Sequence, residues 1–133
     1  MHKTFDVKTS ARSDMVDITS KVAAIVAESG VSGGLCLVFV AHTTAAVTIN
    51  EGADPAVQRD IMDALDKLIP WNAGYRHMEG NSAAHIKVTL TGSSEQVIIE
   101  GGRLVLGTWQ KLFLCEYDGP RTRKVHVKVM GDK

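Results

Sequence analysis

The sequence has no net charge, because 15 Lys and Arg residues balance 15 Asp and Glu residues over a chain of 133 residues. General nucleic-acid binding usually needs a clear basic excess, so this function class is excluded. Aromatic residues make up only 5% of the chain, which leaves few platforms on which single-stranded bases could stack. The 44% of hydrophobic and 23% of charged residues are ordinary for a globular protein and argue against disorder.

Cysteine is scarce, and the chain has no CxxC pair. Cys36 and Cys115 both lie within apolar runs, so we interpret them as small buried thiols rather than as a disulfide or metal ligands. The motifs GxGxxG and GxxxxGK(S/T) are also absent. Their absence disfavours the common nucleotide-binding folds.

Charged residues are missing from Gly30 to Asn50, a stretch about as long as a membrane span. Its glycines, hydroxyl groups and His42 are too polar for hydrocarbon, so we interpret it as two buried strands joined by a polar corner. No apolar segment of a signal peptide follows Met1-His2-Lys3-Thr4. We therefore expect a soluble, cytoplasmic protein without a membrane partner.

Hydrophobic periodicity predicts strands before, between and after two helices. The expected strands cover residues 4–9, 35–41, 45–50, 84–90, 97–99, 104–117 and 125–129, and the expected helices run from Asp17 to Gly30 and from Asp54 to Pro70. This order predicts one α+β domain over residues 1–133, with a mixed, mostly antiparallel sheet and two main helices.

Residues 71–81, after the second expected helix, have no clear period, and His77 in this segment is followed by His85 in the next expected strand. His77 and His85 flank Glu79 and Asn81. Neutral imidazoles beside a carboxylate can bind zinc or another divalent ion if the fold brings them together. The alternative is a polar loop whose histidines cap backbone groups or face solvent, since the spacing of eight residues matches no zinc finger or HExxH helix.

Two further polar segments each allow a functional and a structural interpretation. His42-Thr43-Thr44 follows a buried strand, so the triplet either faces a pocket or satisfies backbone groups at a turn. Near the C-terminus, residues 116–123 combine two acids with two arginines around Gly119-Pro120. Arginine binds phosphate or carboxylate in a bidentate manner, but we favour a turn that is braced by Asp–Arg ion pairs.

Local charge is less balanced than the total. Residues 51–67 hold five acids and two bases, whereas residues 121–133 hold five bases and one acid. A region that attracts anions can therefore form near the C-terminal end.

In their order along the chain, these segments resemble the YjbQ family, small proteins that are labelled secondary thiamine-phosphate synthases. The resemblance covers nearly the whole chain. The matching segments are His42-Thr43-Thr44-Ala45-Ala46, Ile49-Asn50-Glu51, Asp54-Pro55, His77-Met78-Glu79-Gly80-Asn81, Ala84-His85-Ile86, Gly107-Thr108-Trp109-Gln110 and Glu116-Tyr117-Asp118-Gly119-Pro120-Arg121.

The resemblance implies a homotrimer of α+β subunits and a divalent metal, zinc or magnesium, held by His42, His77 and His85. The implied reaction joins a hydroxymethylpyrimidine diphosphate to a thiazole phosphate and releases pyrophosphate, so the site must neutralise a departing anion. The implied catalytic residues are Glu79, Asn81, Gln110 and Arg121, and the implied contacts to the phosphorylated substrate are Thr43, Thr44, Asp118 and Arg123.

Two other function classes stay open. One is a metal-dependent hydrolase of small phosphate esters, which needs the same metal and arginines and an activated water. The other is a non-catalytic trimer that binds a phosphorylated metabolite or a metal. A panel of phosphate substrates, with and without chelator, separates the hydrolase from a synthase, and the binding trimer would show thermal stabilisation by its ligand without turnover of any thiamine precursor.

Overall fold

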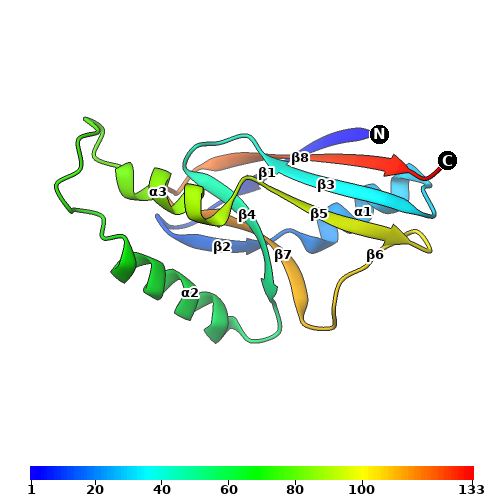
Figure 1. Ribbon diagram of the computed structural model, residues 1–133, viewed down its shortest axis with the longest axis horizontal. Helices are drawn as coiled ribbons and strands as arrows, with labels where there is room; N and C mark the ends of the chain where they lie inside the picture. The colour runs from blue at the N-terminus through cyan, green and yellow to red at the C-terminus, as the bar shows by residue number, and fades with distance from the viewer.

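Eight strands in two antiparallel sheets and three helices make up the fold, as the computed structural model of residues 1–133 shows (Figure 1). This architecture confirms the predicted α+β class. The strands are β1 (His2–Lys8), β2 (Asp14–Asp17), β3 (Gly34–Val40), β4 (Ala45–Glu51), β5 (Ser94–Glu100), β6 (Arg103–Leu104), β7 (Gln110–Glu116) and β8 (Thr122–Gly131). The helices are α1 (Thr19–Ser29), α2 (Pro55–Leu68) and α3 (Ser82–Thr91).

Sheet A has the strand order β1-β8-β3-β5-β6, and sheet B has the order β2-β7-β4. All strand pairs in both sheets are antiparallel. The main hydrophobic core packs side chains of sheet A and α1 against one face of sheet B, for example Val38, Val127 and Val22 with Val47 and Leu114. The fold is therefore held by burial between two sheets that meet face to face.

The other face of sheet B has its own, smaller core. Ala46, Cys115 and Tyr117 pack there against Ala84 and Val88 of α3. Because sheet B is covered on both faces, residues 112–117 are buried without a break, as expected for a strand with two apolar faces. Both cysteines are buried free thiols, which confirms their interpretation.

The helix ends follow the signals in the sequence for two of the three helices. Asp54 Oδ1 accepts a hydrogen bond from Ala56 N at 2.9 Å, and Pro55 is the first residue of α2. Gly30 ends α1 in the left-handed conformation at φ 70°. Asp17 accepts from Thr19 N at 2.9 Å, although the N-cap of α1 is Ile18, one residue later than expected.

The strand expected over residues 84–90 is wrong, because Ser82–Thr91 forms helix α3. Its buried residues Ala83, Ala84, Lys87 and Val88 are spaced as one helical face. The alternation of Ala84, Ile86, Val88 and Leu90 imitated a strand, because the helix buries a lysine and exposes Ile86 and Leu90.

The single strand expected over residues 104–117 is also wrong, since a loop over 105–109 separates β6 from β7. Gln110 Oε1 accepts from Gly107 N at 2.8 Å, and Gln110 N donates to Gly107 O at 3.0 Å, which closes a turn before β7. The structure adds β2, for which we expected no strand.

The uncharged stretch from Gly30 to Asn50 forms β3 and β4 with a corner between them, as predicted. None of the three helices is long and apolar enough to cross a membrane.

Candidate functional site

A pocket of about 520 Å³ lies where the loop 71–81 meets the start of α3. Its lining combines aromatic, cationic and imidazole side chains: Gly74, Tyr75, Arg76, His77, Ser82, His85 and Ile86. Sequence reasoning identified the two histidines but not Tyr75, Arg76 or Ser82. The only signal for these three was their place in or beside an irregular segment rich in polar residues.

His77 and His85 are brought together as predicted. Their ring centroids are 5.4 Å apart, and the planes are nearly perpendicular at 89°. His77 is exposed on the loop, whereas His85 is half-buried on the first turns of α3. Two imidazoles that face one open pocket can bind a metal ion or donate hydrogen bonds to an anion.

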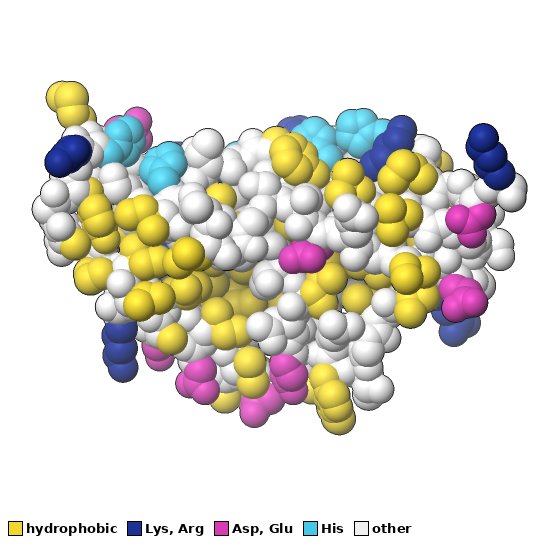
Figure 2. Space-filling model, in the orientation of Figure 1, with side chains coloured by type: hydrophobic (Ala, Val, Ile, Leu, Met, Phe, Trp, Pro, Cys, Tyr) yellow, Lys and Arg dark blue, Asp and Glu magenta, His cyan; other side chains and the backbone are white.

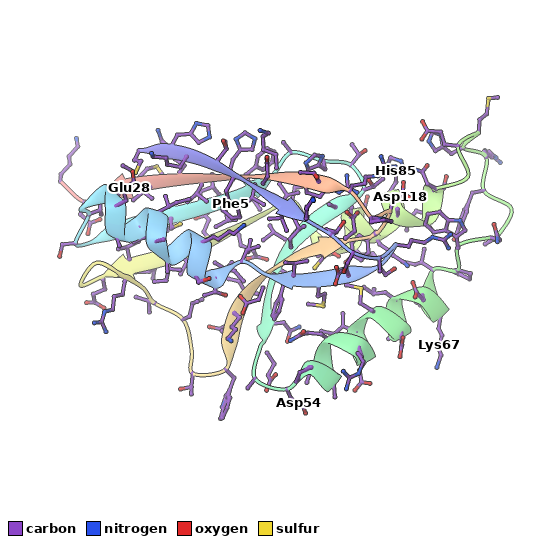
Figure 3. All side chains as sticks on the ribbon, turned by 180° about the vertical axis from the view of Figure 1, so that it is seen from behind. Phe5, Glu28, Asp54, Lys67, His85 and Asp118 are labelled. Atoms are coloured by element: carbon purple, nitrogen blue, oxygen red, sulfur yellow. The ribbon has the colours of Figure 1, made fainter.

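Asn81, Asp118 and Arg121 form a chain of polar contacts beside the start of α3. Asn81 Nδ2 donates to Asp118 Oδ2 at 2.9 Å, and Arg121 donates from Nη2 to Asp118 Oδ2 at 3.1 Å and from Nε to Asp118 O at 2.7 Å. The structure therefore contains the predicted turn braced by an Asp–Arg ion pair. His85 and Asp118 lie at the same end of the molecule (Figure 3).

Asn81 leaves two groups without their usual partners. Its side chain does not cap α3, because Oδ1, the atom that would accept from the first helical N–H groups, makes no hydrogen bond, while Nδ2 donates to Asp118. Its Oδ1 atom is buried and has no hydrogen-bond partner in the chain. Since an unsatisfied buried acceptor costs about 1–3 kcal/mol, a donor from a ligand or a water is expected there. The uncapped end of α3 also presents a partial positive charge to the pocket.

A buried hydrogen-bond network around Glu116 holds the turn that carries Asp118 and Arg121. Glu116 is fully buried and pairs with Arg123, whose side chain is only 5% exposed. Thr9 Oγ1 donates to Glu116 Oε1 at 2.7 Å, and Tyr117 N and Asp118 N both donate to Oε2 at 3.1 Å. Arg123 is thus committed to Glu116 inside the protein, in contrast to the implied direct contact with substrate. Nothing in the sequence pointed to Thr9.

The triplet 42–44 lies at the corner before β4, close to this network. Thr44 Oγ1 accepts from Arg123 Nη2 at 2.8 Å, so its hydroxyl serves the turn interpretation. His42 Nε2 accepts from Lys124 N at 2.9 Å. Burial, with Arg123 nearby, lowers the pKa of His42, which favours the neutral ring that this bond requires. Thr43 is exposed.

Two of the other predicted residues do not line the pocket: Gln110 lies far from it, whereas Glu79 lies on the loop beside it. Gln110 begins β7, whereas Glu116 ends it, so at about 3.3 Å per residue the two lie about 20 Å apart. Its amide closes the turn at Gly107. Glu79 is an exposed side chain of the loop, two residues from His77.

These residues supply only part of a binding site for a divalent metal ion. His77 and His85 suit two positions of a zinc site, which needs four ligands in all. No group of three or more His, Cys, Asp or Glu side chains in the chain could hold a metal ion. The predicted set of His42, His77 and His85 is therefore not assembled within one chain, and further ligands would have to be water or another subunit.

Comparisons with known proteins agree over nearly the full length. The family model described as UPF0047 protein YjbQ-like matches residues 3–132. UPF0047 protein YugU of Bacillus subtilis is 50% identical over 132 residues, covering 98% of this chain and 100% of that protein.

Solved structures show the same fold. A YjbQ/UPF0047 family protein of Clostridium acetobutylicum, described as uncharacterized, is 55% identical with a TM-score of 0.95 over 96% of this chain and 99% of its own. A protein of unknown function from Sulfolobus solfataricus is 36% identical with a TM-score of 0.96 over 99% of this chain and 97% of its own.

Proposed function

The chain belongs to the UPF0047 protein YjbQ-like family, and we propose that it is a metal-assisted transferase of the thiamine-phosphate synthase type. The reaction breaks the C–O bond between a pyrimidine methylene and its diphosphate, so that pyrophosphate leaves with the electron pair. The thiazole nitrogen then supplies the electron pair of the new C–N bond. The site must bind two phosphorylated molecules and stabilise the departing anion.

The observation that carries the proposal is the pocket that joins His77 and His85 with Arg76 and the start of α3. Each of these groups favours an anion: Arg76 by its charge, α3 by its dipole and the imidazoles by hydrogen bonds. Arg121 and Asn81 both donate hydrogen bonds to Asp118. The half-exposed guanidinium of Arg121 adds positive charge at this turn. These groups would hold the diphosphate while the C–O bond breaks.

Further residues would orient the reactants. The unpartnered Oδ1 of Asn81 would accept a hydrogen bond from an amino group or a bound water, and Glu79 on the loop would do the same from the solvent side. His77 and His85 would hold a divalent ion, zinc or magnesium. When bound, such an ion supplies positive charge to the leaving pyrophosphate.

A homotrimer is part of the proposal, because His42 and Gln110 lie outside the pocket of their own chain and would join the site of a neighbouring subunit. Exposed apolar side chains away from sheet A support self-association, among them Leu68, Leu90 and Trp109. Figure 2 shows hydrophobic side chains gathered around α3. The two buried free thiols support a cytoplasmic location.

The test combines metal analysis of the purified protein with an assay of thiamine phosphate and pyrophosphate formation from the two phosphorylated precursors. We expect His77→Ala and His85→Ala each to lose metal and turnover. Thr89→Ala, one turn further along α3 on an exposed position, is the matched control and should retain both. Full metal content and full activity in both histidine variants would contradict the proposal.

A non-catalytic binder is the second candidate, favoured by the lack of a complete metal-ligand set within one chain. It predicts that phosphorylated precursors raise the melting temperature without turnover. Hydrolysis of simple phosphate esters that chelator abolishes would instead identify a metal-dependent phosphoesterase.

A further inference from the structure

A second pair of histidines, His2 and His126, lies on sheet A rather than at α3. His2 is the first residue of β1, and His126 lies in the neighbouring strand β8. In the register of these strands His2 faces Lys128 and Thr4 faces His126, so the two histidines are diagonal neighbours. Histidines gather in two groups in Figure 2, one at the α3 end and one over β1 and β8.

The two rings meet through their nitrogens. His2 Nε2 and His126 Nδ1 are 3.1 Å apart, and one ring donates its N–H to the other. The ring centroids are 5.3 Å apart, with planes inclined by only 23°. The two facing nitrogens therefore lie side by side, one of them protonated and the other with a free lone pair.

This region opens to solvent through a shallow pocket of about 470 Å³ that His2, Leu37, Phe39, Ala41, His126 and Lys128 line. Phe39 packs against His126 at a centroid distance of 6.2 Å and limits how far that ring can turn. The charged neighbours are Lys128, and Lys124 paired with Asp6 at 3.6 Å. An ion bound to the two rings would keep water on its open side.

We propose that His2 and His126 form a site for a divalent transition-metal ion that prefers imidazole, such as zinc. Metal–nitrogen bonds of about 2.0–2.1 Å place two imidazole nitrogens of one ion about 2.9–3.4 Å apart, for ligand angles between square and tetrahedral. The observed 3.1 Å falls within this interval. Neutral histidine exists as two tautomers, so the ring protons move to His2 Nδ1 and His126 Nε2, which frees both facing lone pairs without a change of charge.

The inference is independent of the pocket at α3. A metal held by His2 and His126 would join β1 to β8 near the N-terminus, and it uses neither His77 nor His85. The two ligands come from adjacent strands, β1 and β8, and the hydrogen bond between the rings keeps them together before an ion binds. Imidazole ligands select zinc, nickel or copper over magnesium and calcium.

The experiment is a zinc titration of the full, untagged chain, followed by long-range ¹H–¹⁵N spectra of the imidazole rings. We expect the signals of His2 Nε2 and His126 Nδ1 to shift together as zinc is added, also in the His77→Ala/His85→Ala double variant. His2→Gln and His126→Gln should each abolish the shift of the remaining ring. Lys128→Gln, which removes only a neighbouring charge, should keep it.

Two results would overturn the proposal. The first is that neither ring responds to equimolar zinc in the wild-type chain. The second is that each ring still responds when the other is replaced, which would place the ion on other ligands. His2 is exposed at the start of an edge strand, so His2→Gln tests the site even if His126→Gln perturbs folding.

Discussion

Arg123 and Glu116 form an ion pair inside the protein, with side chains that are 5% and 0% exposed. Arg123 Nε donates to Glu116 Oε1 at 2.8 Å, and Arg123 Nη2 also donates to Thr44 Oγ1. Five donors in total surround the one carboxylate. This pair connects the end of β7 to the start of β8 and fixes the turn that carries Asp118 and Arg121.

Arg123→Met should therefore lower the free energy of unfolding by about 3–5 kcal/mol, because it leaves the Glu116 carboxylate buried without its cation. The control is Lys124→Met at the next position, where an exposed lysine lies 3.6 Å from Asp6. It should change the free energy by less than about 1 kcal/mol. Urea unfolding of both variants measures the difference, and equal values would show that the pair is not needed for stability.

The strands of sheet A could be predicted because one face of each is apolar. The buried residues Val125, Val127 and Val129 alternate along β8 as the sequence indicated. Helix α2 could be predicted from Asp54 and Pro55, whose side chains begin it. In these segments, local pattern and tertiary packing agree.

Helix α3 could not be predicted in the same way, because its packing contradicts the usual meaning of residue type. Lys87 is buried, since its ammonium pairs with Asp66 of α2 and lies 5.8 Å above the ring of Tyr117. Ile86 and Leu90 are exposed instead. No local signal reveals a lysine whose partner is on another helix.

Only part of the candidate site could be predicted from the sequence. His77 and His85 are eight residues apart and meet across one loop, so their proximity is a local property. Gln110 and His42 matched the family by sequence, but each side chain accepts a backbone hydrogen bond away from the pocket, from Gly107 N and from Lys124 N of β8 respectively. A resemblance assigns residues to a site without stating which subunit supplies them.

The ion pair between Lys87 and Asp66 should hold α2 against α3. None of the 14 residues of α2 is fully buried, and the partly buried Met62 and Leu65 supply apolar contacts to the core. Asp66→Asn leaves the ammonium of Lys87 without a charged partner and should cost about 1–3 kcal/mol. Native-state hydrogen exchange should then speed up throughout α2.

Asp63→Asn, on an exposed position of the same helix, is the matched control and should leave exchange in α2 unchanged. If both variants exchange alike, the helix is held by apolar contacts of Met62 and Leu65 alone.

Gly119 should not tolerate a side chain, because its backbone passes close to other atoms. A Cβ atom there would lie 2.4 Å from Ala11 O, 2.7 Å from Glu116 Cγ and 2.8 Å from Thr9 Oγ1. Gly119→Ala therefore forces the turn apart and should destabilise the protein by about 1–3 kcal/mol.

Gly107→Ala is the control for this change. Its Cβ would meet only the flexible side chain of Gln110, at 3.2 Å, so we expect a loss below about 1 kcal/mol. Thermal unfolding compares the two variants, and a Gly119→Ala protein as stable as Gly107→Ala would disprove the steric argument.

The two thiols should resist modification in the native protein. Burial raises the pKa of Cys36 to about 11 and that of Cys115 to about 12. The thiolate is the nucleophile, and a raised pKa lowers its fraction at any pH below that value. A disulfide reagent at pH 8 should therefore label both thiols only as fast as the protein unfolds, and at once in denaturant. Rapid labelling of either thiol in the folded chain would contradict this expectation.

A substitution of Asp118 can distinguish a role in catalysis from a role in stability. Its carboxylate positions Asn81 and Arg121, at 2.9 and 3.1 Å, without lining the pocket itself. Asp118→Asn removes the charge that orients both partners, and we expect kcat/KM for thiamine phosphate formation to fall about 10–100-fold, as for other supporting residues of catalytic sites.

Stability should change little in Asp118→Asn, by less than about 1 kcal/mol, because the amide keeps the shape and one acceptor oxygen of Asp118 and the Arg121 side chain is 52% exposed, against 16% for Asp118. Asp14→Asn is the matched control: its carboxylate also braces a turn, accepting from Ser10 N at 3.1 Å and Ser10 Oγ at 3.0 Å, and it is opposite Glu116 in the register of β2 and β7 but holds neither Asn81 nor Arg121. If Asp118→Asn and Asp14→Asn retain the same kcat/KM, the contacts of Asp118 serve only the turn. If Asp118→Asn alone loses activity while both unfold alike in urea, Asp118 is a positioning residue for Asn81 and Arg121, and the pocket at the start of α3 is where the chemistry takes place.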